Sequence, residues 1–123
     1  MQTTDDTRIR ETLDRYVEGM RTADVALLRS AFHDHANMFG DFGDDLMAAP
    51  IETLFDWAAA ELDPGATGDD HRVEVEDVEV AGDVALARVY ERDFFGGDAR
   101  EFFTLVRTDD GWRITSKSWA TLA

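Results

Sequence analysis

The sequence predicts an α+β fold in which three N-terminal helices pack on a strongly curved antiparallel sheet. Up to Leu62, apolar residues recur mainly at helical spacing, whereas from His71 onward they alternate with a period of two. The last period-two segment is a hairpin, Arg100–Thr121, with Asp109-Asp110-Gly111 at its turn. Helices followed by strands joined through tight turns are typical of α+β domains. A chain of 123 residues suits one such domain, and we expect residues 1–123 to form it.

The composition limits the classes of partner. The formal net charge is −15 and the isoelectric point is about 4.3, and such a charge repels nucleic-acid phosphates and anionic lipids. We therefore expect neither nucleic acid nor a membrane as a partner. The lack of cysteine excludes disulfides and thiol chemistry. The Thr- and Asp-rich N-terminus is unlike a signal peptide, so we expect a cytoplasmic protein. The acidity fits a high-salt host and a GC-rich genome equally well.

The first two helices are predicted from their apolar stripes and caps. Residues Thr7–Met20 form the first, with Thr4 as its cap, and Asp24 caps the second, Val25–Phe32. The stripe of the first helix consists of Ile9, Leu13, Tyr16, Val17 and Met20. A buried tyrosine needs a partner for its hydroxyl, so Tyr16 either reaches the rim of the core or points into a polar cavity.

The segment before the third helix contains His33-Asp34-His35, a pair of candidate metal ligands. Metal sites usually need a third protein ligand, which the pattern does not indicate, so we expect no metal and no cofactor. The rest of this segment is assigned to a short strand, a polar turn and a brief return strand: Asn37–Gly40, Asp41–Asp45 and Leu46-Met47. Pro50 suits the first position of the third helix, Ile51–Leu62. Its inward stripe consists of Ile51, Leu54, Phe55, Ala58 and Leu62, with Trp57 beside it.

The remaining segments are predicted to form a four-stranded antiparallel meander. The first strand runs from His71 to Val80, and its alternation slips around Asp77, as a β-bulge would cause. Ala81-Gly82-Asp83 turns the chain into a second strand, Val84–Phe94. The C-terminal hairpin then supplies the other two strands.

The hairpin turn decides which face of the sheet each residue occupies. A three-residue loop with Gly111 in the left-handed region pairs Thr108 with Trp112. This register places Phe102, Thr104, Val106, Trp112, Ile114, Ser116 and Ser118 on the core side. The outer face then carries Leu86, Tyr90, Phe103, Leu105 and Trp119. Since an apolar patch of this kind usually meets a partner, we expect a homodimer through the outer face of the sheet.

A curved sheet wrapped around helices forms a cone, and its open end is a common place for a pocket. We expect the pocket wall to include Tyr16, Met20, Met38, Phe55 and Trp57. Three residues are candidates for proton transfer at the rim, beside Tyr16: His33, His35 and Asp41.

The sequence resembles the nuclear transport factor 2-like superfamily, and more narrowly its branch labelled "putative lumazine-binding" or SnoaL-like. The resemblance rests on the segments Tyr16–Met20, Asp24–Arg29, Ala31–Ala36, Pro50-Ile51, Phe55-Asp56-Trp57, Ala81–Ala85, Phe103-Thr104-Leu105 and Gly111–Ile114. It implies the cone-shaped, cystatin-like fold. The superfamily includes isomerases, dehydratases, cyclases, binding domains and partner-binding scaffolds.

The steroid isomerases of this superfamily use a Tyr, a carboxylate base and a protonated carboxylic acid. The resemblance places these roles at Tyr16, at Gly40 and near Phe103, so only the first is filled. Three functions therefore compete. The chain binds a small apolar or planar metabolite, or it is a lyase, isomerase or cyclase of a small hydrophobic substrate, or it is a dimerising scaffold without a ligand.

Overall fold

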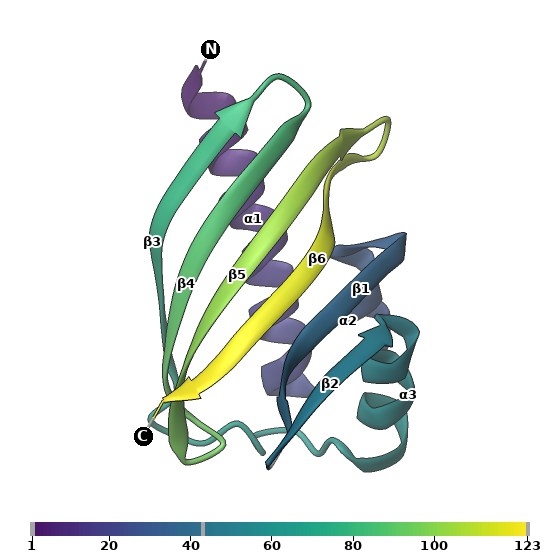
Figure 1. Cartoon of the computed structure of the whole chain (residues 1–123), viewed down its shortest axis with the longest axis vertical. Coiled ribbons are helices and arrows are strands. Elements are labelled where there is room, and N and C mark those ends of the chain that lie inside the picture. The colour runs from purple at the N-terminus through teal and green to yellow at the C-terminus, as the bar shows by residue number, and fades with distance from the viewer. Residues whose placement is uncertain (1, 43, 123) are drawn as a thin grey trace.

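The computed structural model describes residues 2–42 and 44–122 and has the predicted α+β architecture. Helix α1 lies across one face of a curved six-stranded sheet, and α2 and α3 cover the same face toward one end (Figure 1). The elements are α1 (Gln2–Thr22), α2 (Val25–Ser30), β1 (Phe32–Phe42), β2 (Asp45–Pro50), α3 (Glu52–Glu61), β3 (Arg72–Ala81), β4 (Val84–Phe94), β5 (Gly97–Thr108) and β6 (Gly111–Leu122). The predicted α+β cone is confirmed.

The strand order is β2-β1-β6-β5-β4-β3. The predicted antiparallel meander is confirmed in β3 to β6, whereas β1 joins the sheet by pairing parallel to β6. This parallel pairing brings the segment after the first two helices beside the last strand of the chain. It therefore places residues from both halves of the sequence around the open end of the cone.

The helices form where the apolar stripes predict, but their ends differ. Helix α1 begins at Gln2, so Thr4 lies within the helix rather than capping it. The cap of α2 is confirmed: the Asp24 side chain accepts a hydrogen bond from the Leu27 amide at 3.0 Å. Helix α2 ends at Ser30, and the chain turns directly into β1. The predicted last turn of this helix is therefore the start of a strand.

The segment between α2 and α3 is more extended than predicted. Strand β1 includes His33-Asp34-His35. Its pairs lie on either side of this segment, at Phe32 with β6 and from Asn37 onward with both β2 and β6. Pro50 ends β2 rather than starting a helix, and Ile51 is the N-cap of α3. The Ile51 amide donates to the carbonyl of Ala36 at 2.9 Å, which fixes the start of α3 against β1.

In the C-terminal hairpin the predicted register is wrong near the turn and correct beyond it. Thr108 pairs with Gly111 across a two-residue turn, so Leu105 faces Ile114. A β-bulge follows, in which Thr115 is the extra residue. The Thr104 hydroxyl shares one hydrogen bond with the Thr115 hydroxyl, at 2.7 Å, and another with the Ser116 hydroxyl, at 2.6 Å. Beyond the bulge the predicted pairs Thr104–Ser116 and Phe102–Ser118 are confirmed.

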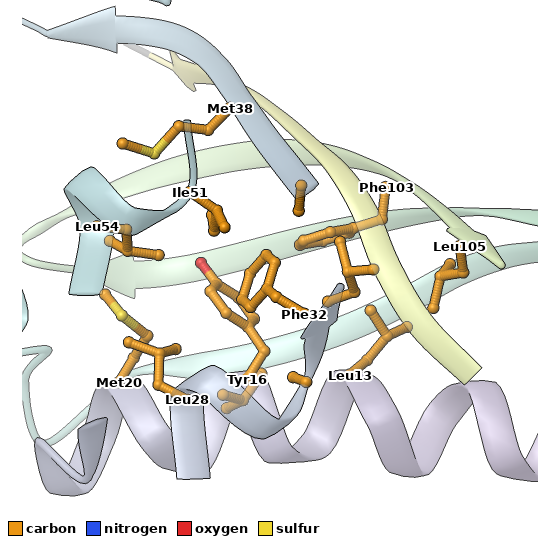
Figure 2. Packing of buried hydrophobic residues seen from close by; sticks show 14 of the residues in the cluster. Leu13, Tyr16, Met20, Leu28, Phe32, Met38, Ile51, Leu54, Phe103 and Leu105 are labelled. Atoms are coloured by element: carbon orange, nitrogen blue, oxygen red, sulfur yellow. The ribbon is translucent and has the colours of Figure 1, made fainter. Parts of the chain in front are cut away.

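The prediction that Trp112 and Ile114 lie on the core side is confirmed, whereas the faces predicted for β5 and for β6 beyond the bulge are reversed. Phe103 and Leu105 are each 1% exposed and pack among the residues that face α1 (Figure 2). The centroids of the Phe103 and Tyr16 rings are 5.5 Å apart. Trp119 also lies on the inner side. Of the residues assigned to the outer face, Leu86 and Tyr90 remain there, whereas Phe102 replaces Phe103 as its exposed aromatic residue. The error arose because the alternation is interrupted once within β6.

The bulge predicted near Asp77 is confirmed, because the register of β3 with β4 shifts between Val75 and Asp77. Inner positions of β4 carry Ala85, Ala87 and Val89, which are buried in the core. The next inner position of this strand is Glu91, which is fully buried.

Candidate functional site

A cavity of about 510 Å³ opens at the end of the cone formed by the last turns of α1, by α3 and by the ends of the strands. Its apolar walls are formed by Met20, Met38, Met47, Leu54, Trp57, Phe94, Phe95 and Trp119. The exposed polar residues in its lining, Asp41, Thr53 and Thr121, mark its mouth. The polar residues that are buried in its lining are Tyr16, Glu101 and Lys117. This size and this division between apolar wall and few polar groups are typical of small-molecule sites.

Tyr16, Glu101 and Lys117 form a connected polar group at the inner end of the cavity. The Tyr16 hydroxyl donates to Glu101 Oε2 at 3.0 Å, and Lys117 Nζ lies 3.2 Å from the same oxygen. Glu101 comes from β5 and Lys117 from β6, both on the inner face, while Tyr16 reaches them from α1. The Lys117 ammonium also lies 3.9 Å from the centroid of the Trp119 ring, a favourable cation–π contact.

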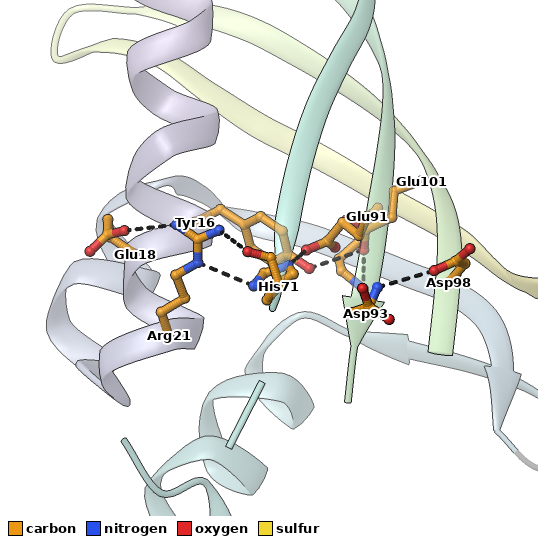
Figure 3. A network of polar contacts seen from close by, with 9 residues as sticks. Tyr16, Glu18, Arg21, His71, Glu91, Asp93, Asp98 and Glu101 are labelled. Atoms are coloured by element: carbon orange, nitrogen blue, oxygen red, sulfur yellow. Dashed lines mark hydrogen bonds and ion pairs between the residues drawn. The ribbon is translucent and has the colours of Figure 1, made fainter. Parts of the chain in front are cut away.

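A second buried pair lies behind Glu101. His71 Nε2 and Glu91 Oε1 are 2.7 Å apart, and both side chains are 1% exposed. Arg21, at the end of α1, donates from Nε to His71 Nδ1 at 3.1 Å and from Nη2 to the His71 carbonyl at 2.9 Å. Figure 3 shows this chain of contacts running from Glu18 and Arg21 through His71 to Glu91, with Glu101 and its partner Tyr16 beside it.

Burial changes the protonation of these groups. It raises the pKa of Glu101 well above the ordinary value, with the nearby Glu91 carboxylate as the second cause. Burial likewise raises the pKa of Glu91. It also raises the pKa of Tyr16, and the charge of Glu101 adds to that effect. The pKa of His71 is lowered by burial and by the Arg21 charge. Burial therefore shifts each of the four groups toward its uncharged form.

The β4–β5 turn forms one side of the cavity mouth and has an unusual backbone. Asp93 and Phe95 have φ values of 53°, a region that non-glycine residues seldom occupy. The Phe95 amide donates to the Thr67 carbonyl at 2.9 Å, and the Asp93 amide donates to Asp98 Oδ1 at 3.1 Å. These bonds hold Phe95 at the cavity, where the centroids of the Phe95 and Trp57 rings are 6.1 Å apart.

The cavity brings together most of the predicted wall residues. Its lining includes Tyr16, Met20, Met38 and Trp57, and also Asp41. Phe55 does not line it: the ring is buried in the core, edge-on to Phe32 at 5.7 Å. It turns inward because it lies on the face of α3 that packs against β1.

The three predicted rim groups do not act on the cavity as a set. His33 and His35 lie outside its lining, and the His35 amide donates to His33 Nδ1 at 3.0 Å. Asp41 holds the end of β6: its carbonyl accepts from Trp119 Nε1 and its carboxylate accepts from the Thr121 amide, both at 3.0 Å. These contacts explain Asp41 as a residue that joins two strands.

Sequence reasoning missed Glu101, Lys117, Glu91 and His71. One signal was available, since Glu101 lies two residues before Phe103 and therefore on the same face of β5. Glu91 similarly continues the inward series of β4. Carboxylates are mostly exposed to solvent in proteins, so neither glutamate stood out as a buried group. Lys117 was misplaced because the bulge in β6 reverses the direction of its side chain.

Within residues 2–42 and 44–122, no group of three or more His, Asp or Glu side chains is placed to hold a metal ion. None of the helices in the same part of the chain is long and apolar enough to cross a bilayer.

A family model described as "Putative lumazine-binding" matches residues 4–120. Among solved structures, the chain is similar to a nuclear transport factor 2-like protein of unknown function from Shewanella baltica OS155. The two sequences are 28% identical, the TM-score is 0.87, and the match covers 100% of this chain and 98% of that one. A similar protein from Methylobacillus flagellatus KT has 27% identity, a TM-score of 0.86 and coverage of 98% and 94%.

A ketosteroid isomerase-like protein from Erwinia carotovora atroseptica SCRI1043 has 16% identity, a TM-score of 0.71 and coverage of 95% of both chains, a likeness of fold alone. No curated protein matches the chain.

Proposed function

Because the chain belongs to the "putative lumazine-binding" family of the nuclear transport factor 2-like superfamily, we propose that it binds a small, planar and mostly apolar molecule in the cavity of the cone. The observation that carries the proposal is the buried group Tyr16, Glu101 and Lys117 at the inner end of a cavity with apolar walls. Aromatic and Met side chains suit a flat ring system, and the polar group would fix its orientation.

Intrinsic fluorescence tests this proposal directly, because Trp57 and Trp119 line the cavity. Lumazine, a flat fused-ring dione, is a suitable probe since the family description names it. Saturable quenching is expected. Tyr16→Phe should weaken binding about fivefold, because one hydrogen bond contributes about 1 kcal/mol.

The control is Ser118→Ala, which removes a hydroxyl from the outer face of the sheet, outside the cavity lining, and should leave the affinity unchanged. Native mass spectrometry of protein purified from its own host extends the test to the natural ligand. The proposal fails if lumazine and related flat probes give no saturable change and no small molecule is retained.

A second candidate is an isomerase or lyase, and the protonation of the site favours it. A protonated Glu101 would be a hydrogen-bond donor in the cavity, with its other oxygen held by the Tyr16 hydroxyl, and such a donor stabilises an oxyanion that develops on a carbonyl substrate. Glu101 stands close to the acid position that the resemblance placed near Phe103. The base position falls on Gly40, so the base would have to come from elsewhere.

Hydrogen–deuterium exchange separates this candidate from simple binding. A neutral ketone incubated with the protein in deuterated buffer should exchange the hydrogens beside its carbonyl, as followed by NMR. Glu101→Gln should slow this exchange more than it weakens binding of the ketone. Exchange no faster than in buffer alone would leave only the binding function.

We also propose the homodimer through the outer face of the sheet. Its support is a set of exposed apolar side chains, with Phe39 and Leu86 each 43% exposed and Phe102 52% exposed. Phe39 and Phe102 both flank Ser118 in neighbouring strands. Light scattering should give twice the chain mass, and Phe102→Glu should give the monomer mass. A wild-type monomer at high concentration would refute the dimer.

A further inference from the structure

Glu91 and Glu101 are two buried carboxyl groups on neighbouring strands, and each has one oxygen in use. Glu91 Oε1 meets His71 Nε2, and Glu101 Oε2 meets Tyr16 and Lys117. The other oxygens, Glu91 Oε2 and Glu101 Oε1, are buried without a hydrogen-bond partner. Glu91 pairs with Ala99 and Glu101 with Val89, so the two glutamates are diagonal neighbours on the inner face.

The contacts of His71 determine where its own hydrogen lies. The guanidinium of Arg21 has only donors, so His71 Nδ1, which meets Arg21 Nε, must be an acceptor. The single hydrogen of the neutral ring then lies on Nε2 and is donated to Glu91 Oε1. Protonating Nδ1 would break the bond to Arg21 and place two positive charges together. His71 is therefore neutral and holds Glu91 Oε1 as an acceptor.

These contacts leave Glu91 Oε2 and Glu101 Oε1 as the oxygens that can carry a proton. We propose that Glu91 and Glu101 share a single proton on the pair of oxygens that lack other partners, so that together with Lys117 the inner end of the cavity carries no net charge and takes a neutral hydrogen-bonding ligand. The ligand class in this inference rests on the proposed binding function, whereas the shared proton does not.

The alternatives leave buried groups uncompensated. With no proton, two buried carboxylates on neighbouring strands would share one ammonium, which contacts Glu101. With two protons, the Lys117 ammonium would have no counter-charge, which is costly for a buried ion. The raised pKa of each glutamate agrees with one shared proton at neutral pH.

The other charged groups near the pair do not change this balance. On α1, Arg21 is paired with Glu18 at 3.4 Å. On β5, Asp98 lies at the cavity and accepts from the Tyr90 hydroxyl and the Asp93 amide. The remaining groups that face the pair are the neutral Tyr16 and His71, together with Lys117.

This charge balance favours a neutral ligand over an anionic one. A neutral carbonyl or amide can accept a hydrogen bond from Lys117 without adding charge. A carboxylate would bring an uncompensated charge into the cavity unless the glutamates took up a second proton. Binding of an anion should therefore weaken as the pH rises, whereas binding of a neutral ligand should not.

Infrared difference spectroscopy counts the shared proton without any ligand. Wild-type protein at neutral pH should show the carbonyl stretch of one protonated carboxyl, measured against Glu91→Gln/Glu101→Gln as the blank. Glu91→Gln alone should lose the band, because the remaining Glu101 is ionised beside Lys117. Absence of the band from the wild type, or its persistence in Glu91→Gln, would overturn the shared proton. Circular dichroism verifies that the variants are folded.

A matched pair of probes tests the ligand class, with 2-naphthamide as the neutral member and 2-naphthoate as its anionic isostere. Wild-type protein should bind the amide about tenfold or more tightly than the carboxylate. The double variant, which leaves Lys117 without a counter-charge, should reverse this preference. Tighter binding of 2-naphthoate by the wild type would overturn the neutral-ligand class. If neither probe binds, the binding function fails, and the infrared count still decides the proton.

Discussion

Lys117→Met tests the electrostatics of the cavity most directly. The substitution keeps a long apolar side chain beside Trp119 but removes the buried cation that contacts Glu101. Removing one partner of a buried ion pair typically costs about 3–5 kcal/mol, because the other charge is left uncompensated. For a domain whose total stability is about 5–15 kcal/mol, the variant should lose much of its stability at neutral pH.

The loss should depend on pH, and its sign follows from Glu101. Without Lys117 the pKa of Glu101, already raised, rises further. A carboxyl whose folded-state pKa is raised contributes stability below its ordinary value of 4.5 and loses that contribution as the pH rises through the folded-state pKa. The deficit of Lys117→Met should therefore shrink on acidification, by up to about 1.4 kcal/mol per pH unit.

Urea unfolding followed by circular dichroism at a series of pH values measures this deficit. The control, Lys117→Met with Glu101→Gln, removes both charges and should recover most of the lost stability at neutral pH. The reasoning is refuted if Lys117→Met loses less than about 1 kcal/mol at neutral pH, or if its loss is the same at every pH.

Three further predictions concern other parts of the fold. In Gly40→Ala the new methyl group would overlap the Trp119 ring, so we expect the free energy of unfolding to fall by about 1–3 kcal/mol and the tryptophan emission to change. Its control is Gly97→Ala, whose new methyl group has no atom within 4 Å and which should change neither the stability nor the emission. Asp24→Ala removes the cap of α2 and should cost about 1 kcal/mol in urea unfolding; an unchanged midpoint would contradict the role of the cap. Because the pKa of Glu101 is raised, its contribution to wild-type stability should fall as the pH rises above 4.5, and thermal unfolding of Glu101→Gln should depend less steeply on pH.

Periodicity predicted the layers of this fold but not how they join. The stripes of α1 and α3 and the alternation in β3 and β4 are local patterns, so the sequence displays them directly. The parallel pairing of β1 with β6 joins Phe32 to Ile114, far apart along the chain. No local signal reports such a pairing, since it depends on the whole sheet.

The candidate site was predicted only on its apolar side. Tyr16, Met20, Met38 and Trp57 were found because side chains on one face of a helix or strand reach the same interior. Glu101 and Lys117 were missed because charged residues are seldom fully buried, and because a strand pattern does not reveal where a bulge lies. A carboxylate that continues an inward apolar series was the signal to weigh.

The extra residue in β6 determines where this hairpin can shorten as the sequence diverges. Thr115 and Ser116 together oppose Thr104, so losing either one would leave a regular ladder, with Lys117 still opposite Phe103. Losing Ser118 would instead turn either Lys117 or Trp119 away from the interior. Deletions in homologous chains should therefore be tolerated at 115–116 and be selected against in the three residues that follow.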